Sequence, residues 1–318
     1  MRRRIAYGQN FLVNAAAIDH LLDQSSIGEA DVILEIGPGE GVITELLAHR
    51  VHHVIAIEKD PQLVARLRRR FAGRANVTVF ESDFLAFPLP ATSYKVFANL
   101  PFNITAAVVA KLSGAAVVPG DTYLAVQREA AARFAGYPEA GTETLAAVLL
   151  KPWFEPAVVH RFERTDFMPA PGVDVVMLRL RKRGPPVLTT REAQRYRDLV
   201  AFCFTGWHGS VGRALARLLD PAQLDHVHRA ITTTAIPLPE EHRPASLWDS
   251  KPTQVPFAVW VALYHALSRV AKASVWRRLA GAEDRLRQQQ AGLQKVHRTR
   301  VRPPPATRRP DHRLRIPA

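Results

Sequence analysis

The chain has 318 residues, of which 47% are hydrophobic, so it can form two folded domains with well-packed cores. Its net charge of +14 favours a polyanionic partner, while its single cysteine, Cys203, excludes a disulfide framework and a cysteine-based zinc site. No apolar run approaches the ~20 residues that a membrane-spanning helix needs, and no signal-peptide core follows the N-terminal arginines, so we expect a cytoplasmic protein without a membrane span or a metal.

The chain begins with a basic arm, Arg2–Arg4, which leads into Gln9-Asn10-Phe11-Leu12 and then into a predicted helix over about 15–22. As a bare segment, this could be a simple N-terminal arm in which Asn10 only caps a turn and Phe11 only fills the core. The residues alone therefore leave the role of the arm open.

The next segment combines a buried strand, a glycine turn and the start of a helix. An apolar strand over Val32–Ile36 carries an acid, Glu35, and is followed by Gly37, Gly39 and Gly41. Glycine is needed where the backbone approaches a ligand too closely for a Cβ atom, so a nucleotide-type site is favoured over an ordinary turn. Dinucleotide sites have the spacing G-x-G-x-x-G. The spacing here is G-x-G-x-G after an acid, which resembles the first motif of class I S-adenosylmethionine (SAM) methyltransferases.

Two further strands each place an acid at the same predicted edge. The strand His53–Glu58 ends in a carboxylate that can accept hydrogen bonds from both hydroxyls of a ribose. The Glu58 carboxylate would repel a 2′-phosphate, which disfavours NADP, whereas the first two strands alone leave NAD possible. After a third strand over Val77–Phe80, Asp83 can either bind the amino group of an adenine or cap a helix, and the residues favour neither role.

The fourth strand, over about 94–98, runs into Asn99-Leu100-Pro101-Phe102, at the edge where open α/β sheets bind ligands. This tetrapeptide suits a planar exocyclic amine as the methyl acceptor. Such an amine is a poor nucleophile because its lone pair is delocalised into the ring, so it needs alignment more than a strong base. The side-chain oxygen of Asn99 and the carbonyl of Leu100 can accept hydrogen bonds from the two N–H groups of this amine. Pro101 fixes the turn, and Phe102 offers a face on which a flipped base can stack.

An isolated Asn-x-Pro-aromatic motif is more often a strand end with a capping Asn and a buried aromatic, since short motifs recur by chance. Here the motif lies one strand after Asp83 and two strands after Glu58. That order and spacing argue against coincidence.

Strands that alternate with helices up to residue 150 predict a Rossmann-like, mostly parallel sheet with helices on both faces. Further strands are expected over about 122–127, 157–162 and 175–180, with a helix over about 128–134. The last two strands form a hairpin-like closure that gives the sheet one antiparallel strand. The predicted fold is thus α/β with a small all-helical C-terminal domain.

We predict a methyltransferase domain over 1–184, a helical RNA-binding domain over 185–271 and a basic Arg/Pro-rich tail over 272–318. The first part of the tail, to about residue 294, can extend as a basic helix, and the part beyond His297 is expected to be disordered. Ten of the 14 net positive charges lie in this tail. The overall charge therefore says less about the active domain, and a solvated tail kept for solubility stays open as a reading.

Together these motifs resemble Erm-type 23S rRNA adenine N6-methyltransferases, which are similar to the small-subunit rRNA dimethyladenosine transferases of the same superfamily. The resemblance covers about residues 4–270, and its motifs are Gln9–Leu12, Glu35–Gly41, Glu58–Asp60, Asp83, Asn99–Phe102 and Phe167–Asp174. It implies a SAM-dependent enzyme in which Asn99, Leu100, Pro101 and Phe102 are catalytic. It also implies a cofactor site made by Asn10, Leu12, Gly37, Gly39, Glu58, Asp83 and Asn99. Phe102 stands where the family often has Tyr, and stacking does not need the hydroxyl.

The helical region separates the two branches of the superfamily. The segments Tyr196–Val200, Phe204–Trp207, Arg213–Arg217 and Pro256–Trp260 resemble the C-terminal domain of actinobacterial Erm enzymes. The Gln-Arg-Arg-Lys-like run typical of the small-subunit enzymes is absent after the last strand. The resemblance therefore implies a monomer that methylates one adenine in 23S rRNA and confers resistance to macrolide, lincosamide and streptogramin B antibiotics.

The alternative within the superfamily is a housekeeping small-subunit (16S) rRNA dimethyltransferase. A non-catalytic RNA-binding factor with the same fold is a reading from another class, against which the intact Glu58, Asp83 and Asn99–Phe102 set argues. A DNA adenine methyltransferase more commonly has Asn/Asp-Pro-Pro-aromatic, and Leu100 departs from that pattern.

Overall fold

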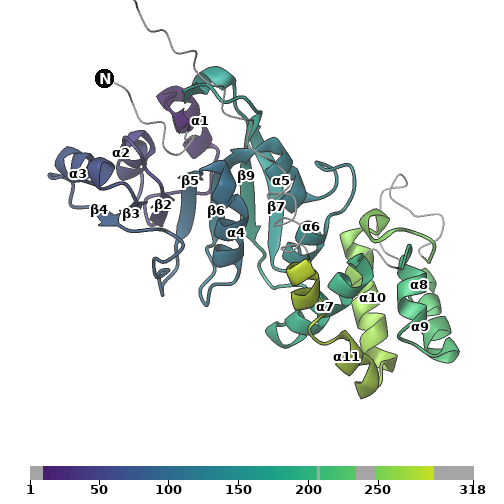
Figure 1. Ribbon diagram of the computed structural model, residues 1–318. Helices are drawn as coiled ribbons and strands as arrows, with labels where there is room; N and C mark the ends of the chain where they lie inside the picture. Colours follow the sequence, from purple (N-terminus) through teal and green to yellow (C-terminus); the bar gives the residue numbers. More distant parts are fainter. Residues whose placement is uncertain (1–9, 206–207, 234–247, 290–318) are drawn as a thin grey trace, which may run out of the picture.

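The computed structural model describes residues 10–205, 208–233 and 248–289, in which a central sheet lies beside a group of helices (Figure 1). The basic arm, Gln9, Trp207 and the end of the predicted tail, 290–318, lie outside the described residues. Within the described ranges, no helix is both long and apolar enough to cross a membrane.

The central sheet has seven strands in the order β4–β3–β2–β5–β6–β9–β7. Their bounds are β2 (Val32–Ile36), β3 (His53–Glu58), β4 (Val77–Glu81), β5 (Lys95–Asn99), β6 (Asp121–Gln127), β7 (Phe154–Arg161) and β9 (Val175–Lys182). β9 runs antiparallel to both β6 and β7, and the other neighbours pair in parallel. The predicted mostly parallel sheet with one antiparallel strand is therefore confirmed.

Helices cover both faces of the sheet. The bounds of these helices are α1 (Ala15–Asp23), α2 (Val42–Ala48), α3 (Pro61–Arg70), α4 (Thr105–Ser113) and α5 (Arg128–Ala135). One core joins α1 and α2 to side chains such as Ile33 and Phe97, and the other joins α4 and α5 to side chains such as Leu34 and Val96. Neighbouring residues of one strand thus enter opposite cores, as the period of two in a strand requires.

The strands predicted over Val32–Ile36 and His53–Glu58 have the same bounds in the structure, and α3 begins where Asp60 caps it by accepting a 2.8 Å hydrogen bond from the Gln62 amide. Two helices were not predicted, α4 and the short α6 (Leu145–Leu150). The six apolar residues of α6 are too few to show a helical period.

A two-stranded pair that was also not predicted holds the start of the described chain. β1 (Phe11–Leu12) pairs antiparallel with β8 (Phe167–Met168), which follows the 3₁₀ turn η2 (Arg164–Asp166). The Asp166 carbonyl accepts from the Val13 amide at 2.8 Å, and its carboxylate accepts from the Asn14 side chain at 2.7 Å. Residues 11–14 are therefore held against β8 and the turn before it.

The helical part gathers at one end of the molecule, away from α1 (Figure 1). Its elements are α7 (Thr190–Phe204), α8 (Val211–Ala216), α9 (Pro221–Thr233), η4 (Pro252–Gln254), α10 (Phe257–Val270) and α11 (Ala273–Leu279). Its core includes Val148 of α6, whose carbonyl accepts a 3.0 Å hydrogen bond from the Tyr196 hydroxyl. The core of the helical part thus continues into the sheet-bearing part.

The segment predicted as one basic helix beyond Lys272 instead forms two helical pieces, α11 and residues 282–289. The helix is interrupted between them at Gly281, whose φ of 74° is in the region that favours glycine. Leu279, Ala282 and Leu286 are buried. This part of the chain is therefore folded onto the helical part.

Candidate active site

The glycine turn after β2 forms the base of the site. Gly37, Gly39 and Gly41 have φ values of 65°, 58° and 83°, and the Gly37 amide donates to the carbonyl of Ile57 in β3 at 2.9 Å. A Cβ atom on Gly39 would lie 2.8 Å from the ring of Phe11. Glycine is thus required twice at this turn, by the backbone angle and by the close approach of an aromatic ring.

Glu35 is fully buried just before this turn, and neither of its carboxylate oxygens has a hydrogen-bond partner in the described part of the chain. Burial raises the pKa of Glu35 to about 8. Thr44 lies close enough to lower this pKa somewhat, although no hydrogen bond of normal geometry joins the two, and the charge of Glu58 raises it. A buried carboxyl without partners beside a glycine turn is a group that a bound cofactor's donors can satisfy.

Glu35→Gln is expected to change how stability depends on pH. Because the pKa of Glu35 is raised on folding, the folded state holds its proton more tightly, and stability falls as pH rises from about 4.5 to about 8. The glutamine variant cannot ionise, so above pH 8 it should be more stable than the wild type by on the order of a few kcal/mol. Below pH 5 the difference should be small. Thermal unfolding of the cofactor-free protein across this range measures the effect.

The exposed Glu29 provides the matched control, because Glu29→Gln makes the same chemical change on the surface. Its melting temperature should stay parallel to that of the wild type at all pH values. A Glu35→Gln curve that also ran parallel to the wild type would show that Glu35 is ionised in the folded protein at neutral pH.

Glu58 ends β3 and is held by three backbone amides. Its Oε1 accepts from the amides of Lys59 and Asp60 at 2.8 and 2.9 Å, and its Oε2 accepts from the amide of Gly39 at 3.2 Å. A carboxylate oxygen has two acceptor sites, so Oε1 is already fully used and Oε2 keeps one site. Only Oε2 can thus accept a further hydrogen bond, from one ribose hydroxyl. The sequence predicts that this carboxylate accepts hydrogen bonds from both ribose hydroxyls, and the existing contacts leave room for one.

Asp83 lies in the turn after β4, where it has two partners. Its Oδ1 accepts from the Leu85 amide at 2.9 Å, and its Oδ2 accepts from the Lys59 ammonium at 2.8 Å. The hydrogen bond from Lys59, followed by that from Leu85, lowers the pKa of Asp83. Lys111 fixes the same turn through the carbonyls of Phe84 and Leu85. Asp83 therefore caps a turn, and its contact with an adenine stays a prediction.

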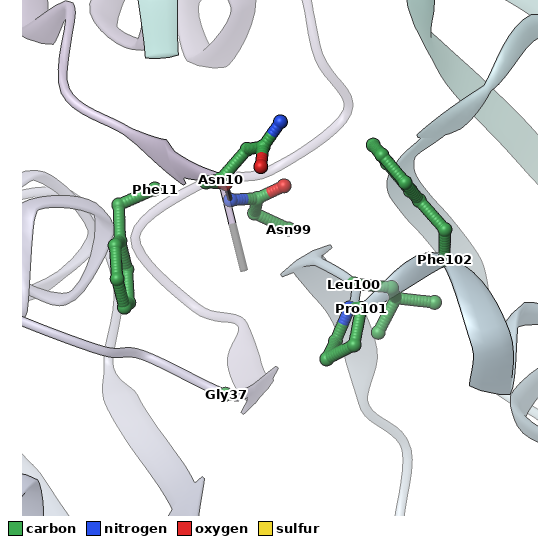
Figure 2. A pocket seen from close by; sticks show the side chains of 7 residues that line it. All are labelled: Asn10, Phe11, Gly37, Asn99, Leu100, Pro101 and Phe102. Atoms are coloured by element: carbon green, nitrogen blue, oxygen red, sulfur yellow. Dashed lines mark hydrogen bonds between the residues drawn. The ribbon is translucent and has the colours of Figure 1, made fainter. Parts of the chain in front are cut away.

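The Asn99-Leu100-Pro101-Phe102 segment begins at the end of β5 and runs into a 3₁₀ turn, η1 (Phe102–Ile104). The Asn99 amide nitrogen donates to the main-chain carbonyl of Asn10 at 2.8 Å. Among the described residues, no donor bonds to the side-chain oxygen of Asn99, which can therefore accept a hydrogen bond from a ligand. Figure 2 shows Asn99 and the Phe102 ring on facing sides of the pocket, with Leu100 and Pro101 between them.

One pocket brings together most of the predicted residues. It is lined by Asn10, Phe11, Gly37, Asn99, Leu100, Pro101 and Phe102 (Figure 2). The side chain of Leu12 lies instead in the core with α1 and α2, so any contact of Leu12 with a cofactor would come from its backbone. Gly39, Glu58 and Asp83 do not line this pocket. They lie at the carboxyl ends of the neighbouring strands β2, β3 and β4.

Phe11 is the lining residue that the sequence reading left as a possible core filler. Its place follows from the pairing of β1 with β8 and from the contact with Gly39. Neither contact is local in sequence, so no pattern in the chain could have shown it. Within the described ranges, no group of three or more His, Cys, Asp or Glu side chains could hold a metal ion.

A comparison with solved structures defines the class of protein. The structure titled "Crystal structure of 23S rRNA methyltransferase ErmE" superposes with a TM-score of 0.71 and 27% sequence identity, and the match covers 81% of this chain and 100% of that one. SAM fits this site, because the glycine turn lets the backbone approach it, and Glu35 and Oε2 of Glu58 can accept hydrogen bonds from it. The fold and the site are those of the SAM-dependent methyltransferases, in which SAM supplies a methyl group from a positively charged sulfur.

The family is defined by sequence. Residues 1–237 match the family described as "Ribosomal RNA adenine dimethylase". A relative from Saccharopolyspora erythraea, "rRNA adenine N-6-methyltransferase", is 33% identical over 229 residues, which are 71% of this chain and 59% of that protein. A relative from Moorella thermoacetica, "Ribosomal RNA small subunit methyltransferase A", is 33% identical over 228 residues, which are 68% of this chain and 79% of that protein. The chain belongs to the ribosomal RNA adenine dimethylase family.

Proposed function

We propose that this enzyme transfers methyl groups from SAM to N6 of an adenine in ribosomal RNA. The observation that carries the proposal is the hydrogen bond from Asn99 to the Asn10 carbonyl, which fixes the side-chain amide and leaves its oxygen free beside Phe102. Family membership supports RNA adenine as the acceptor, and the net charge of +14 supports an RNA partner.

The four residues Asn99–Phe102, which begin at the last residue of β5, have distinct roles in this proposal. The Asn99 oxygen and the Leu100 carbonyl accept hydrogen bonds from the two N–H groups of the adenine amine. These bonds turn its lone pair toward the methyl group. Pro101, with a φ of −57°, holds the turn, and Phe102 stacks on the flipped base. The amine loses its extra proton after transfer, so the chain needs no strong base at this position.

The remaining site residues hold the cofactor in this proposal. Glu58 offers its free Oε2 site to the ribose, Asp83 receives the adenine amino group, and Gly37 and Gly39 let the backbone approach. Asn10 contributes mainly by orienting Asn99, while Leu12 contributes through its backbone. Residues 1–184 then act as the catalytic domain and residues 185–271 as an RNA-binding domain.

We further infer that the target lies in 23S rRNA and that the modification confers resistance to macrolide, lincosamide and streptogramin B antibiotics. The solved structure covered over its full length carries a 23S rRNA methyltransferase title, and the helical segments resemble those of Erm enzymes. The small-subunit relative of equal identity supports the alternative, a 16S rRNA dimethyltransferase. A monomer acting in the cytoplasm, where ribosomal RNA is found, fits either reading.

Methyl transfer from labelled SAM to protein-free 23S rRNA, with 16S rRNA and assembled subunits in parallel, tests the proposal. The modified base is mapped by reverse-transcription stops. A single adenine in the peptidyl-transferase loop is the expected result. Label only on small-subunit particles would move the enzyme to the housekeeping branch, whereas no label on any RNA would contradict the proposed activity.

A further inference from the structure

The C-terminal segment 273–289 is attached to the helical part by a buried cap. Asp198 of α7, which is 4% exposed, accepts from the amides of Gly281 and Glu283 at 3.2 and 3.0 Å. The two hydrogen bonds to Asp198 and the burial of Leu279 and Leu286 hold the segment in a defined position. This segment lies beyond the 1–237 range that matches the family.

A second attachment joins α11 to the end of α8. The Arg278 guanidinium donates to the carbonyls of Arg217 and Leu218. An open pocket of about 520 Å³ lies between α7, the end of α8 and the C-terminal segment. This pocket shares no lining residue with the active-site pocket, and Figure 1 shows α7 and α11 next to each other, well separated from β2 and β5.

The charged groups that line this pocket are Arg217, Arg278 and Arg285, and we call it the arginine pocket. No carboxylate lines it among the described residues. Within that part of the chain, the Arg217 guanidinium has no hydrogen bond or ion pair, and the Arg285 guanidinium donates only to the carbonyl of Ala280, at 2.8 Å. Among the described residues, the pocket therefore gathers three positive charges and no acid.

Several other cations of this protein pair with acids, whereas the three exposed arginines of the pocket have no such pair among the described residues. Arg179 pairs with Asp121, and Lys151 lies 2.6 Å from Glu143. Arg197, next to Asp198 in α7, pairs with Glu283. An anion in the arginine pocket would therefore face three cations and, among the described residues that line it, no acid.

The wall of the pocket is aromatic. The rings of Phe202 and His208 lie 4.8 Å apart at 31°. The Nδ1 atom of His208 is buried and has no partner among the described residues. Burial lowers the pKa of His208, and the charge of Arg217 lowers it further. At neutral pH the positive charge of the pocket thus comes from its arginines, and His208 adds a neutral polar and stacking surface.

We propose that the arginine pocket binds the phosphodiester backbone of the RNA substrate at a point outside the active site. Guanidinium groups form paired hydrogen bonds with phosphate oxygens. The volume exceeds what one phosphate needs, and the aromatic wall suits the attached sugar or base. This inference rests on the proposed function, since it takes ribosomal RNA as the substrate.

The test compares two double variants with the same loss of charge. Arg217→Gln with Arg285→Gln removes two cations from the pocket, whereas Arg191→Gln with Arg277→Gln removes two exposed cations from α7 and α11 outside it. The pocket variant should raise the Kd for a 23S rRNA transcript at least about tenfold, and the control less than about threefold. For the pocket variant, the slope of the logarithm of RNA affinity against the logarithm of salt concentration should become less steep by about one to two. SAM affinity should be unchanged in both.

Further arms separate the possible failures. Arg217→Lys with Arg285→Lys keeps the charge and should restore binding in part, which excludes simple misfolding as the cause. Equal losses in the pocket and control variants would overturn the pocket proposal while wild-type methylation still supported the proposed function. Tight binding of inorganic phosphate that only the pocket variant lost, with RNA affinity unaffected, would assign the pocket to a free anion instead. A wild type that bound no ribosomal RNA would contradict the proposed function itself.

Discussion

Asn99→Ala is expected to lower kcat for methyl transfer by about 10²–10³-fold, the size of effect seen when one aligned hydrogen-bonding group is removed from an active site. The Asn99 oxygen is the one side-chain acceptor of the Asn-Leu-Pro-Phe segment, and its orientation depends on the 2.8 Å bond to the Asn10 carbonyl. The Kd for SAM should rise less than about tenfold, because Glu58 and the glycine turn are untouched. Single-turnover transfer and SAM titration together separate the two effects.

Two variants sharpen this result. Asn99→Asp keeps an acceptor but places an oxygen against the Asn10 carbonyl, so the group should turn away and activity should fall as well, though less than in the alanine variant. Phe102→Tyr keeps the stacking face and should remain active, which controls for disturbance of the pocket. Wild-type kcat in Asn99→Ala would refute the proposed alignment of the amine.

The strands and the glycine turn could be predicted because their signals are local. The period of apolar residues and the G-x-G-x-G spacing are sufficient to place β2 and β3 with their observed bounds. The same kind of signal was present for α4, whose buried residues Thr105, Val108, Val109 and Leu112 have helical spacing. That helix was missed although the chain contained the pattern.

The contacts that make the site work could not be predicted, because they join distant positions. Asn10 and Asn99 are 89 residues apart, and Asn14 and Asp166 are 152 apart. The pairing of β1 with β8 brings Phe11 over the glycine turn, and two-residue strands have no periodicity to detect. The residues of the site were therefore named from motifs, while the orientation of Asn99 became visible only in the fold.

Glu58→Gln is expected to weaken SAM binding by about 10–100-fold, which corresponds to one charge-assisted hydrogen bond and the loss of the carboxylate charge. The existing contacts explain why the change is large. Three backbone amides already point at this side chain, two at Oε1 and one, from Gly39, at Oε2. If the glutamine oxygen replaces Oε1, its amino group must face the Gly39 amide, donor against donor.

The substitution therefore acts twice, on the acceptor for the ribose and on the glycine turn itself. Glu81→Gln, an exposed position at the end of the neighbouring β4, makes the same change without these contacts and should leave the Kd for SAM unchanged. The kcat at saturating SAM should fall much less for Glu58→Gln than for Asn99→Ala, because Glu58 does not touch the amine in this arrangement. An unchanged SAM affinity in Glu58→Gln would show that the amides of the turn, and not a ribose, are the true partners of this carboxylate.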